Sequence, residues 1–322
     1  MAVPYSRYLV YPLPWYSFLI LLGIVLAIIL AVHEQRRKRL PEDTVIDLAL
    51  RIVPFGIIGA RLYYVLFSWD SFKDNPLSIL YIWEGGIAIY GAIIAGFIVL
   101  VFFSRKRSLP VLTLCDVIAP GLVLAQSIGR WGNYFNMEAY GLPVTAPAFC
   151  FFPFAVLIPD AGGWHLATFF YESIWNLFVF LFLWFIARKR FPVQGHLFYH
   201  YLALYAAGRM VIEELRMDSL YSADIRVSQL FSAFVCLLIL IRFFIHAEKT
   251  KRHSMPSLFV FPLGIVALLC AVFISFFPDL FVSHSLTLRI GLLALSSFLF
   301  INSLLIMTLT GSREKKYADN EI

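Results

Sequence analysis

The chain has 322 residues, of which 61% are hydrophobic and 14% charged, with a formal net charge of +6 and a mean hydropathy of +0.80. A water-soluble domain needs polar groups over much of its surface, so this composition excludes a soluble globular protein and predicts a membrane protein. Because segments of alternating apolar and polar residues, the mark of a transmembrane barrel, are few, we expect an all-α, polytopic bundle of transmembrane helices.

Basic residues gather in five clusters, each directly after an apolar run, and these clusters predict the topology. Successive clusters are separated by enough apolar sequence for two crossings of about 20 residues each. The positive-inside rule then places every cluster on the cytoplasmic side. The clusters are Arg36 to Arg39, Arg105 to Arg107, Arg188 to Arg190, Lys249 to Arg252, and Arg313 to Lys316.

This arrangement predicts nine spans, with the N-terminus outside and the C-terminus in the cytoplasm. The expected spans are residues 14–33, 45–67, 85–104, 112–130, 167–187, 196–216, 228–246, 257–277 and 288–310.

A few arginines remain in or at the ends of these spans, mostly toward the outer half. A charge at membrane depth is costly unless it is paired, so a functional role is the default hypothesis for such residues. Together they indicate an anionic partner, and the simplest one for a membrane protein is a phospholipid head group. These arginines are Arg51, Arg61, Arg130, Arg209 and Arg216.

The outer ends of the first three spans carry further polar and small residues. Tyr16 opens the first span, where an interfacial aromatic belt is the simpler interpretation. Gly59 and Ala60 precede Arg61 and allow a neighbouring helix to approach closely, so we expect Arg61 to face protein. Glycines around Tyr90 permit a cavity into which its phenol points; a tyrosine hydrogen-bonded within the bundle is an equally good interpretation.

The densest polar run is Gly129 to Glu138, at the end of the fourth span. Arg130 offers a rigid fork of donors suited to phosphate or carboxylate, and Asn133, Asn136 and Glu138 add donors and acceptors. A polar helix end at the membrane interface is the alternative interpretation. We favour a functional site, because nothing else in the chain concentrates so much hydrogen-bonding capacity at membrane depth.

Two segments complete the polar pattern. Residues 139–165 form the longest outer loop, and their many aromatic side chains predict a small folded cap rather than a disordered linker.

In the sixth span, Arg209, Glu213 and Arg216 have the spacing i, i+4, i+7 and are expected to share one helix face. They form either a self-neutralising network or a site with one guanidinium free for an anionic ligand.

The run Gly129-Arg130-x-Gly132-Asn133-Tyr134-x-Asn136-x-Glu138 resembles the signature of the bacterial prolipoprotein diacylglyceryl transferases at all seven defined positions. The resemblance covers roughly residues 12 to 246. It implies a seven-helix core over residues 1–246, with residues 139–165 as an extracytoplasmic cap, and leaves residues 247–322 as a two-helix membrane extension. Other matching positions are Trp15-Tyr16, Gly59 to Arg61, Gly85-Gly86, Asp116 to Pro120, Tyr171-Glu172, and Arg209 with Glu213 and Arg216.

The resemblance implies that the diacylglyceryl group of phosphatidylglycerol is transferred to the lipobox cysteine of preprolipoproteins, with release of glycerol phosphate. It implies an enzyme of the bacterial cell membrane that needs no cofactor or metal, with its active site toward the outer leaflet. Arg130 and Arg209 match the principal functional arginines and are assigned to the phosphate. Asn133, Asn136 and Glu138 are implied to hold the glycerol head group and to fix Arg130, and Tyr16 matches a family tyrosine in the cavity. The implied supporting residues are Arg61, Glu172, Glu213 and Arg216.

One position departs from the family pattern: Tyr90 stands where some members have a histidine after the paired glycines. A phenol with a pKa of about 10 is a poorer general base at neutral pH than imidazole. Either another group takes the thiol proton or Tyr90 chiefly orients the lipid. Two alternatives to an enzyme are a transporter or scramblase for anionic phospholipids and an inactive paralogue that serves as a scaffold.

Overall fold

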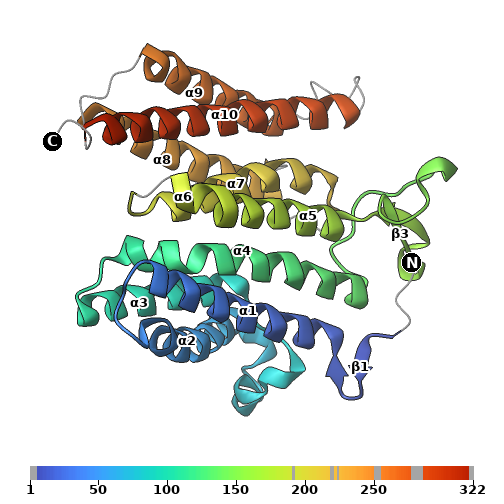
Figure 1. Cartoon of the computed structure of the whole chain (residues 1–322). Helices are drawn as coiled ribbons and strands as arrows, with labels where there is room; N and C mark the ends of the chain where they lie inside the picture. The colour runs from blue at the N-terminus through green and yellow to red at the C-terminus, as the bar shows by residue number, and fades with distance from the viewer. Residues whose placement is uncertain are drawn as a thin grey trace. The chain divides into compact units, whose positions relative to one another are not determined.

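The computed structural model describes residues 6–190, 193–217, 221–222, 225–249, 255–276 and 286–318 (Figure 1). Long helices dominate it, and the sheets among these residues are all two-stranded. This confirms the prediction of an all-α bundle. The helices are α1 (Trp15–Arg37), α2 (Thr44–Phe67), α3 (Ile89–Arg107), α4 (Val111–Asn136), α5 (Thr168–Leu181), α6 (Arg188–Arg190), α7 (His196–Ile212), α8 (Val227–Lys249), α9 (Met255–Phe276) and α10 (Leu286–Ala318).

Short elements connect the long helices. The strands pair as antiparallel hairpins: β1 (Tyr8–Val10) with β2 (Leu13–Pro14), β3 (Ala155–Ile158) with β4 (Gly163–Leu166), and β5 (Tyr221–Ser222) with β6 (Ile225–Arg226). Residues Phe182–Ala187 form a π-helical segment between α5 and α6. The 3-10 turns are Trp69–Ser71, Pro76–Leu80, Ile82–Glu84, Pro147–Phe149, Pro159–Ala161 and Glu213–Leu215.

Each of the nine expected spans falls on a helical segment. In the described part of the chain, six segments are long and apolar enough to cross a membrane, so this is a multi-pass membrane protein. The full count of nine spans stays a prediction, because the expected spans on α2, α7 and α9 are not among these six segments. The six segments are Trp15–Arg37, Ile89–Arg107, Val111–Asn136, Thr168–Arg190, Val227–Ile245 and Leu288–Ile306.

The chain divides into two compact units, which are described separately. Unit 1 comprises Met1–Leu26 and Leu122–Ile322, and unit 2 comprises Ala27–Gly121. The helices α1 and α4 each contribute residues to both units.

In unit 2, α2 packs closely against α3 through glycines. A Cβ atom added to Gly59 would lie 2.7 Å from the carbonyl oxygen of Gly91. The Ala88 amide, just before α3, donates to the Ala60 carbonyl oxygen at 3.0 Å. Backbones this close leave no room for side chains at the crossing, which confirms the predicted role of the small residues.

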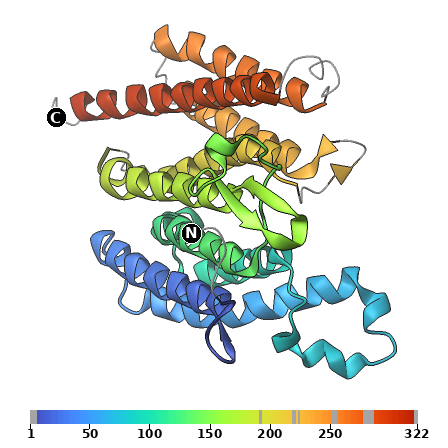
Figure 2. The ribbon, with the colours of Figure 1, turned by 90° about the vertical axis from the view of Figure 1, so that its right-hand side faces the viewer.

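In unit 1, helices α7 to α10 lie side by side in both views (Figures 1 and 2). Their shared core is apolar and includes fully buried residues from three of the four helices. The C-terminal helices therefore pack on α7 and α8 rather than extending away from them. The most deeply buried members of this core are Ala203, Ala207, Cys236, Leu240, Leu293, Phe300 and Leu304.

The sixth predicted span ends earlier than expected. Helix α7 stops at Ile212, the backbone tightens into the 3-10 turn Glu213–Leu215, and Arg216 is extended with φ −87° and ψ 143°. Tertiary pairing explains this end, because Arg216 forms an antiparallel bridge with Gly141 and the Leu142 amide donates to the Leu215 carbonyl oxygen at 2.9 Å. The prediction of a helix through Arg216 was therefore wrong.

The loop over residues 139–165 is folded, as predicted. Strands β3 and β4 form its hairpin, and Pro143 pairs with His165 in a further bridge (Figure 2). The buried side chains of Val156 and Ile158 pack with Phe169 at the start of α5. The hairpin therefore shares a small apolar core with the helices that it caps.

The glycine contact between α2 and α3 gives a matched pair of substitutions on one helix. A methyl group on Gly91 would meet the Gly59 carbonyl and the Tyr63 Cβ atom, whereas one on Gly96 would meet only the Ile52 Cγ2 atom at 3.7 Å. We expect Gly91→Ala to lower the free energy of unfolding by about 1–3 kcal/mol through overpacking. Gly96→Ala should leave it unchanged or raise it slightly, since alanine favours the helix.

Thermal unfolding of the purified protein in detergent measures both effects. Equal stabilities for the two variants would show that the α2–α3 crossing tolerates a side chain and is not as close as described.

Candidate active site

The carboxylate of Glu172, in α5, lies at the centre of an arginine cluster. Its oxygens are 2.6 Å from Arg130 Nη2, 2.8 Å from Arg209 Nη1 and 3.9 Å from Arg216 Nη1. The Glu172 side chain is only 3% exposed. These arginines come from α4, from α7 and from just after the turn that ends α7, so one buried carboxylate joins three parts of the chain.

Glu213 is the second carboxylate of this cluster, and its Oε2 atom lies 2.6 Å from Arg209 Nη2. Arg209 is therefore held on both sides, by Glu172 and by Glu213. Three guanidinium groups thus gather around two carboxylates. All five groups are more than three quarters buried.

The expected helical stripe of Arg209, Glu213 and Arg216 is replaced by a different geometry. Because Arg216 lies beyond the 3-10 turn, it does not continue the face of α7. It approaches Glu172 on α5 instead. The three side chains still gather at one place, but a residue on another helix brings them together.

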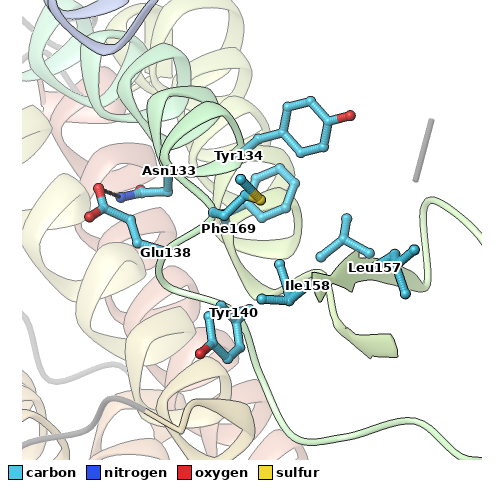
Figure 3. Close-up of a pocket in the computed structure, with 9 residues that line it drawn as sticks. Asn133, Tyr134, Glu138, Tyr140, Leu157, Ile158 and Phe169 are labelled. Carbon is cyan, nitrogen blue, oxygen red and sulfur yellow. Dashed lines mark hydrogen bonds between the residues drawn. The ribbon is translucent and has the colours of Figure 1, made fainter. Parts of the chain in front are cut away.

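Helix α4 ends in the polar run, and the chain then turns back on itself. Glu138 accepts hydrogen bonds on Oε1 from Asn133 Nδ2 at 3.0 Å and from Asn136 Nδ2 at 3.2 Å. Figure 3 shows the Asn133 and Glu138 side chains pointing toward each other. Met137 and Ala139, on either side of Glu138, have φ values of 53° and 54°, a left-handed conformation that non-glycine residues adopt only when their surroundings impose it.

The ion pair of Arg130 differs from the expected one. We expected Asn133, Asn136 and Glu138 to hold Arg130 in place, but the carboxylate that pairs with it is Glu172. Glu138 instead orders the two asparagines and is exposed. The polar run thus presents two groups: an arginine that is largely buried, and two half-buried carboxamides that bond an exposed carboxylate.

Tyr16, at the start of α1, lies against the same part of α4. A Cβ atom on Gly132 would come 2.5 Å from the Tyr16 Cδ2 atom, so only glycine leaves room for this ring. The neighbouring Trp15 stacks on Phe135 with ring centroids 4.8 Å apart. This placement explains one of the glycines in the polar run: it makes room for the tyrosine ring beside α4.

A small pocket lies between the end of α4 and the cap (Figure 3). Its walls are mostly apolar, with Asn133, Glu138 and Tyr140 as its polar members. Strand β3 closes it opposite the helix end, as Figure 3 shows for Leu157 and Ile158. The cap therefore covers part of the exposed polar cluster.

Arg61 and Tyr90 lie in unit 2. Arg61 is buried, and its guanidinium donates to backbone carbonyl oxygens of the segment before α3: Ser78 at 2.7 Å, Ile79 at 2.9 Å, Gly85 at 2.7 Å and Gly86 at 2.9 Å. Its donors thus go to the chain itself, which agrees with the expectation that it faces protein. Tyr90 is 48% exposed, with its ring 6.2 Å from that of Tyr63.

Arg51 lies near the second basic cluster, within unit 2. It hydrogen-bonds the Asp47 carbonyl oxygen, and Asp47 also pairs with Arg107 of that cluster. The Asp47 carboxylate lies 3.7 Å from Arg51 Nη1, so this arginine has an acidic partner on its own helix.

Sequence reasoning did not identify the centre of the cluster or one of its members. Glu172 was expected only to support the arginines, because its position in another span gives no signal of a shared partner. The Tyr205 hydroxyl donates to Glu172 Oε1 at 3.4 Å and was missed, although it precedes Arg209 by one helical turn. Among the described residues, no group of three or more His, Cys, Asp and Glu side chains is arranged to hold a metal ion.

The central position of Glu172 predicts a large effect on stability. We expect Glu172→Gln to lower the free energy of unfolding by about 3 kcal/mol or more, because it leaves buried guanidinium groups without their countercharge. Glu138→Gln is the matched control: its carboxylate is exposed, so the change should stay within about 0.5 kcal/mol. Thermal unfolding in detergent measures both. A Glu172→Gln protein as stable as wild type would contradict the ion-pair geometry.

Comparison with known proteins gives concordant matches. The profile of the family described as prolipoprotein diacylglyceryl transferase matches residues 6–246. A relative from Streptococcus suis is 43% identical over 251 residues, covering 75% of this chain and 90% of its own. Another from Enterococcus faecalis is 43% identical over 262 residues, covering 76% of this chain and 94% of its own.

A relative from Streptococcus mutans is 41% identical over 251 residues, covering 75% of this chain and 93% of its own. All three relatives are named phosphatidylglycerol–prolipoprotein diacylglyceryl transferase. The profile spans well over half of the chain, and the predicted resemblance is confirmed. The chain belongs to the prolipoprotein diacylglyceryl transferase family.

Proposed function

We propose that this protein transfers the diacylglyceryl group of phosphatidylglycerol to the cysteine thiol of a prolipoprotein. The relatives carry this activity in their names. The observation on this chain that carries the proposal is the gathering of three guanidinium groups, those of Arg130, Arg209 and Arg216, around Glu172 and Glu213. Guanidinium groups bind anionic oxygens through their fork of donors, and the phosphate diester of a phospholipid offers such oxygens.

The reaction exchanges one bond to a carbon of the lipid's glycerol. The cysteine sulfur forms a thioether bond to the diacylglyceryl carbon, and the bond from that carbon to the phosphate oxygen breaks. Glycerol phosphate leaves with the electron pair, and the thiol gives up its proton. An unperturbed thiol has a pKa of about 8.5, so the site must favour the thiolate. The phosphate oxygen gains negative charge as it leaves, and preorganised cations stabilise that charge.

In this proposal Arg130 and Arg209 bind the phosphate and stabilise its developing charge. Glu172 and Glu213 hold their guanidinium groups in fixed positions, so little reorganisation is needed when the substrate binds. Arg216 and Tyr205 also contact the Glu172 carboxylate and help to fix its position. Asn133, Asn136 and Glu138 are proposed to bind the hydroxyl groups of the head group, and Tyr16 to line the lipid's side of the cavity.

Two residues of unit 2 enter the proposal through the sequence resemblance. Arg61 supports the segment before α3, since its hydrogen bonds hold four backbone carbonyls of that segment. Tyr90 stands at the start of α3 with an exposed phenol. We assign Tyr90 to orientation of the lipid rather than to proton abstraction, because a phenol is a weak base at neutral pH.

The topology and the division of the chain are part of the proposal. The basic clusters support a cell-membrane protein with its N-terminus outside, its C-terminus in the cytoplasm and its site toward the outer leaflet. Residues 1–246 are proposed as the transferase core, which agrees with the limits of the family match, and residues 247–322 as an extension. The acceptor is proposed to be the lipobox cysteine of the prolipoprotein. No observation favours a phospholipid transporter or an inactive scaffold.

A direct assay tests the activity and the two arginines. The purified protein is incubated with phosphatidylglycerol and a lipobox peptide, and the diacylglyceryl adduct is detected by its mass. Arg130→Ala and Arg209→Ala should each lower turnover at least about 100-fold, because each removes a donor to the leaving phosphate. Arg242→Ala is the control: Arg242, on α8, lies over the Tyr199 ring of α7, and the variant should keep wild-type activity.

An inactive wild type, under conditions where a known transferase works, would refute the proposed function. Near-normal turnover in both arginine variants would refute only the site assignment.

Tyr90→Phe separates the two roles considered for the phenol. If Tyr90 orients the lipid, we expect about a tenfold fall in turnover with an unchanged pH profile, since one hydrogen bond is lost. If Tyr90 were the proton acceptor, turnover would fall about 100-fold or more, and the rise of the rate with pH toward the pKa of a phenol would be lost. Rates measured over a range of pH values distinguish the two.

A further inference from the structure

The helices α9 and α10 lie outside the family match, which ends at residue 246. They nevertheless pack firmly on the family core within unit 1. Leu293, Phe300 and Leu304 of α10 are buried among side chains of α7 and α8. The buried Ser297 hydroxyl donates to the Ala207 carbonyl oxygen of α7 at 3.2 Å. The extension is therefore an integral neighbour of the helix that carries Arg209.

A buried ion cluster joins this extension to the end of α7. Glu214 is 1% exposed, and its Oε1 atom lies 2.8 Å from Arg289 Nη2 of α10. Its other oxygen lies 2.5 Å from Arg226 Nη1 and accepts a hydrogen bond from Gln229 Nε2 at 3.2 Å. A carboxylate buried this deeply needs such partners, because the cost of removing it from water is large. Arg289 is the partner that the extension contributes.

Glu214 links this ion cluster to the candidate active site through its position in the chain. Glu214 is the middle residue of the 3-10 turn Glu213–Leu215. The residue before it, Glu213, holds Arg209 at 2.6 Å, and Arg216 directly after the turn approaches Glu172. Consecutive residues of one short turn therefore face two ion clusters: the candidate active site and the contact with the extension.

We propose that Arg289 is a positioning residue: through its ion pair with Glu214 it holds the turn so that Glu213 keeps Arg209 in place. This inference rests on the proposed function of the Arg209 cluster. It gives the C-terminal helices a role in turnover without contact between them and the substrate. A displacement of about 1 Å at a group that stabilises a transition state lowers the rate about 100-fold in sensitive cases, so a loosened turn is enough to be measured.

The test uses the full-length protein in the adduct assay. Arg289→Met keeps the length of the side chain and removes its charge. We expect kcat to fall about tenfold while KM for phosphatidylglycerol changes by less than about twofold, because the arginines still bind the lipid but are less well placed for the leaving phosphate. Arg289→Lys keeps a cation within reach of Glu214 and should recover most of the rate.

Two further variants separate positioning from packing. Ser297→Ala removes the other polar link from α10 to α7 and should leave kcat unchanged even if the unfolding temperature falls. Glu214→Gln combined with Arg289→Met completes a double-mutant cycle. If Arg289 acts through Glu214, the double variant is no slower than the slower single variant, whereas independent effects would multiply.

The outcomes distinguish this proposal from the one on which it rests. A wild type that forms no adduct overturns the proposed function. An active wild type with an Arg289→Met variant of equal kcat overturns the role of Arg289 alone, as does multiplication of the effects in the cycle. If Arg289→Met does not fold, kcat is compared among Arg289→Lys, Glu214→Gln and Ser297→Ala. An equal kcat in all three variants overturns the positioning role of Arg289.

Discussion

One buried carboxylate organises the candidate site. Glu172 is nearly inaccessible to solvent, and it attracts guanidinium groups from α4, from α7 and from the chain beyond α7. A carboxylate in such surroundings is stable only with its partners in place, and each partner is in turn constrained by it. The cluster therefore holds its arginines rigidly. Rigidly held cations are what a reaction with a phosphate leaving group requires.

The same physical principle recurs one residue away from this cluster. Glu214 is buried between Arg226 and Arg289 as Glu172 is buried between its arginines. Two adjacent glutamates, Glu213 and Glu214, thus belong to separate charge clusters on opposite sides of one turn. In a membrane, where charges must be paired internally, such pairings connect helices with a specificity that apolar packing alone does not supply.

Much of the fold was predictable from the sequence, because apolar length and basic clusters report directly on the solvent that surrounds each segment. The positions of the helices followed from these signals, and the folded cap followed from the aromatic content of residues 139–165. The end of α7 did not, since the bridge between Arg216 and Gly141 depends on a contact between segments far apart in the chain. The partner of Arg130 was missed for the same reason: Glu138 is near in sequence, but Glu172 is near in space. The family signature named the candidate residues, whereas the contacts among them required coordinates.

The short segment after Glu138 has a consequence for cooperativity. Residues 139–143 hydrogen-bond to the cap hairpin at Leu166 and to the turn after α7 at Leu215, so the same few amides serve both. Opening of the cap therefore also breaks bonds of the turn that carries Glu213. The Gly141 amide bonds the hairpin and the neighbouring Leu142 amide bonds the turn, so we expect their exchange with solvent to follow a single local unfolding event rather than two. The cap, the end of α4 and the end of α7 are thus linked through a segment that contributes few of the polar groups of the site.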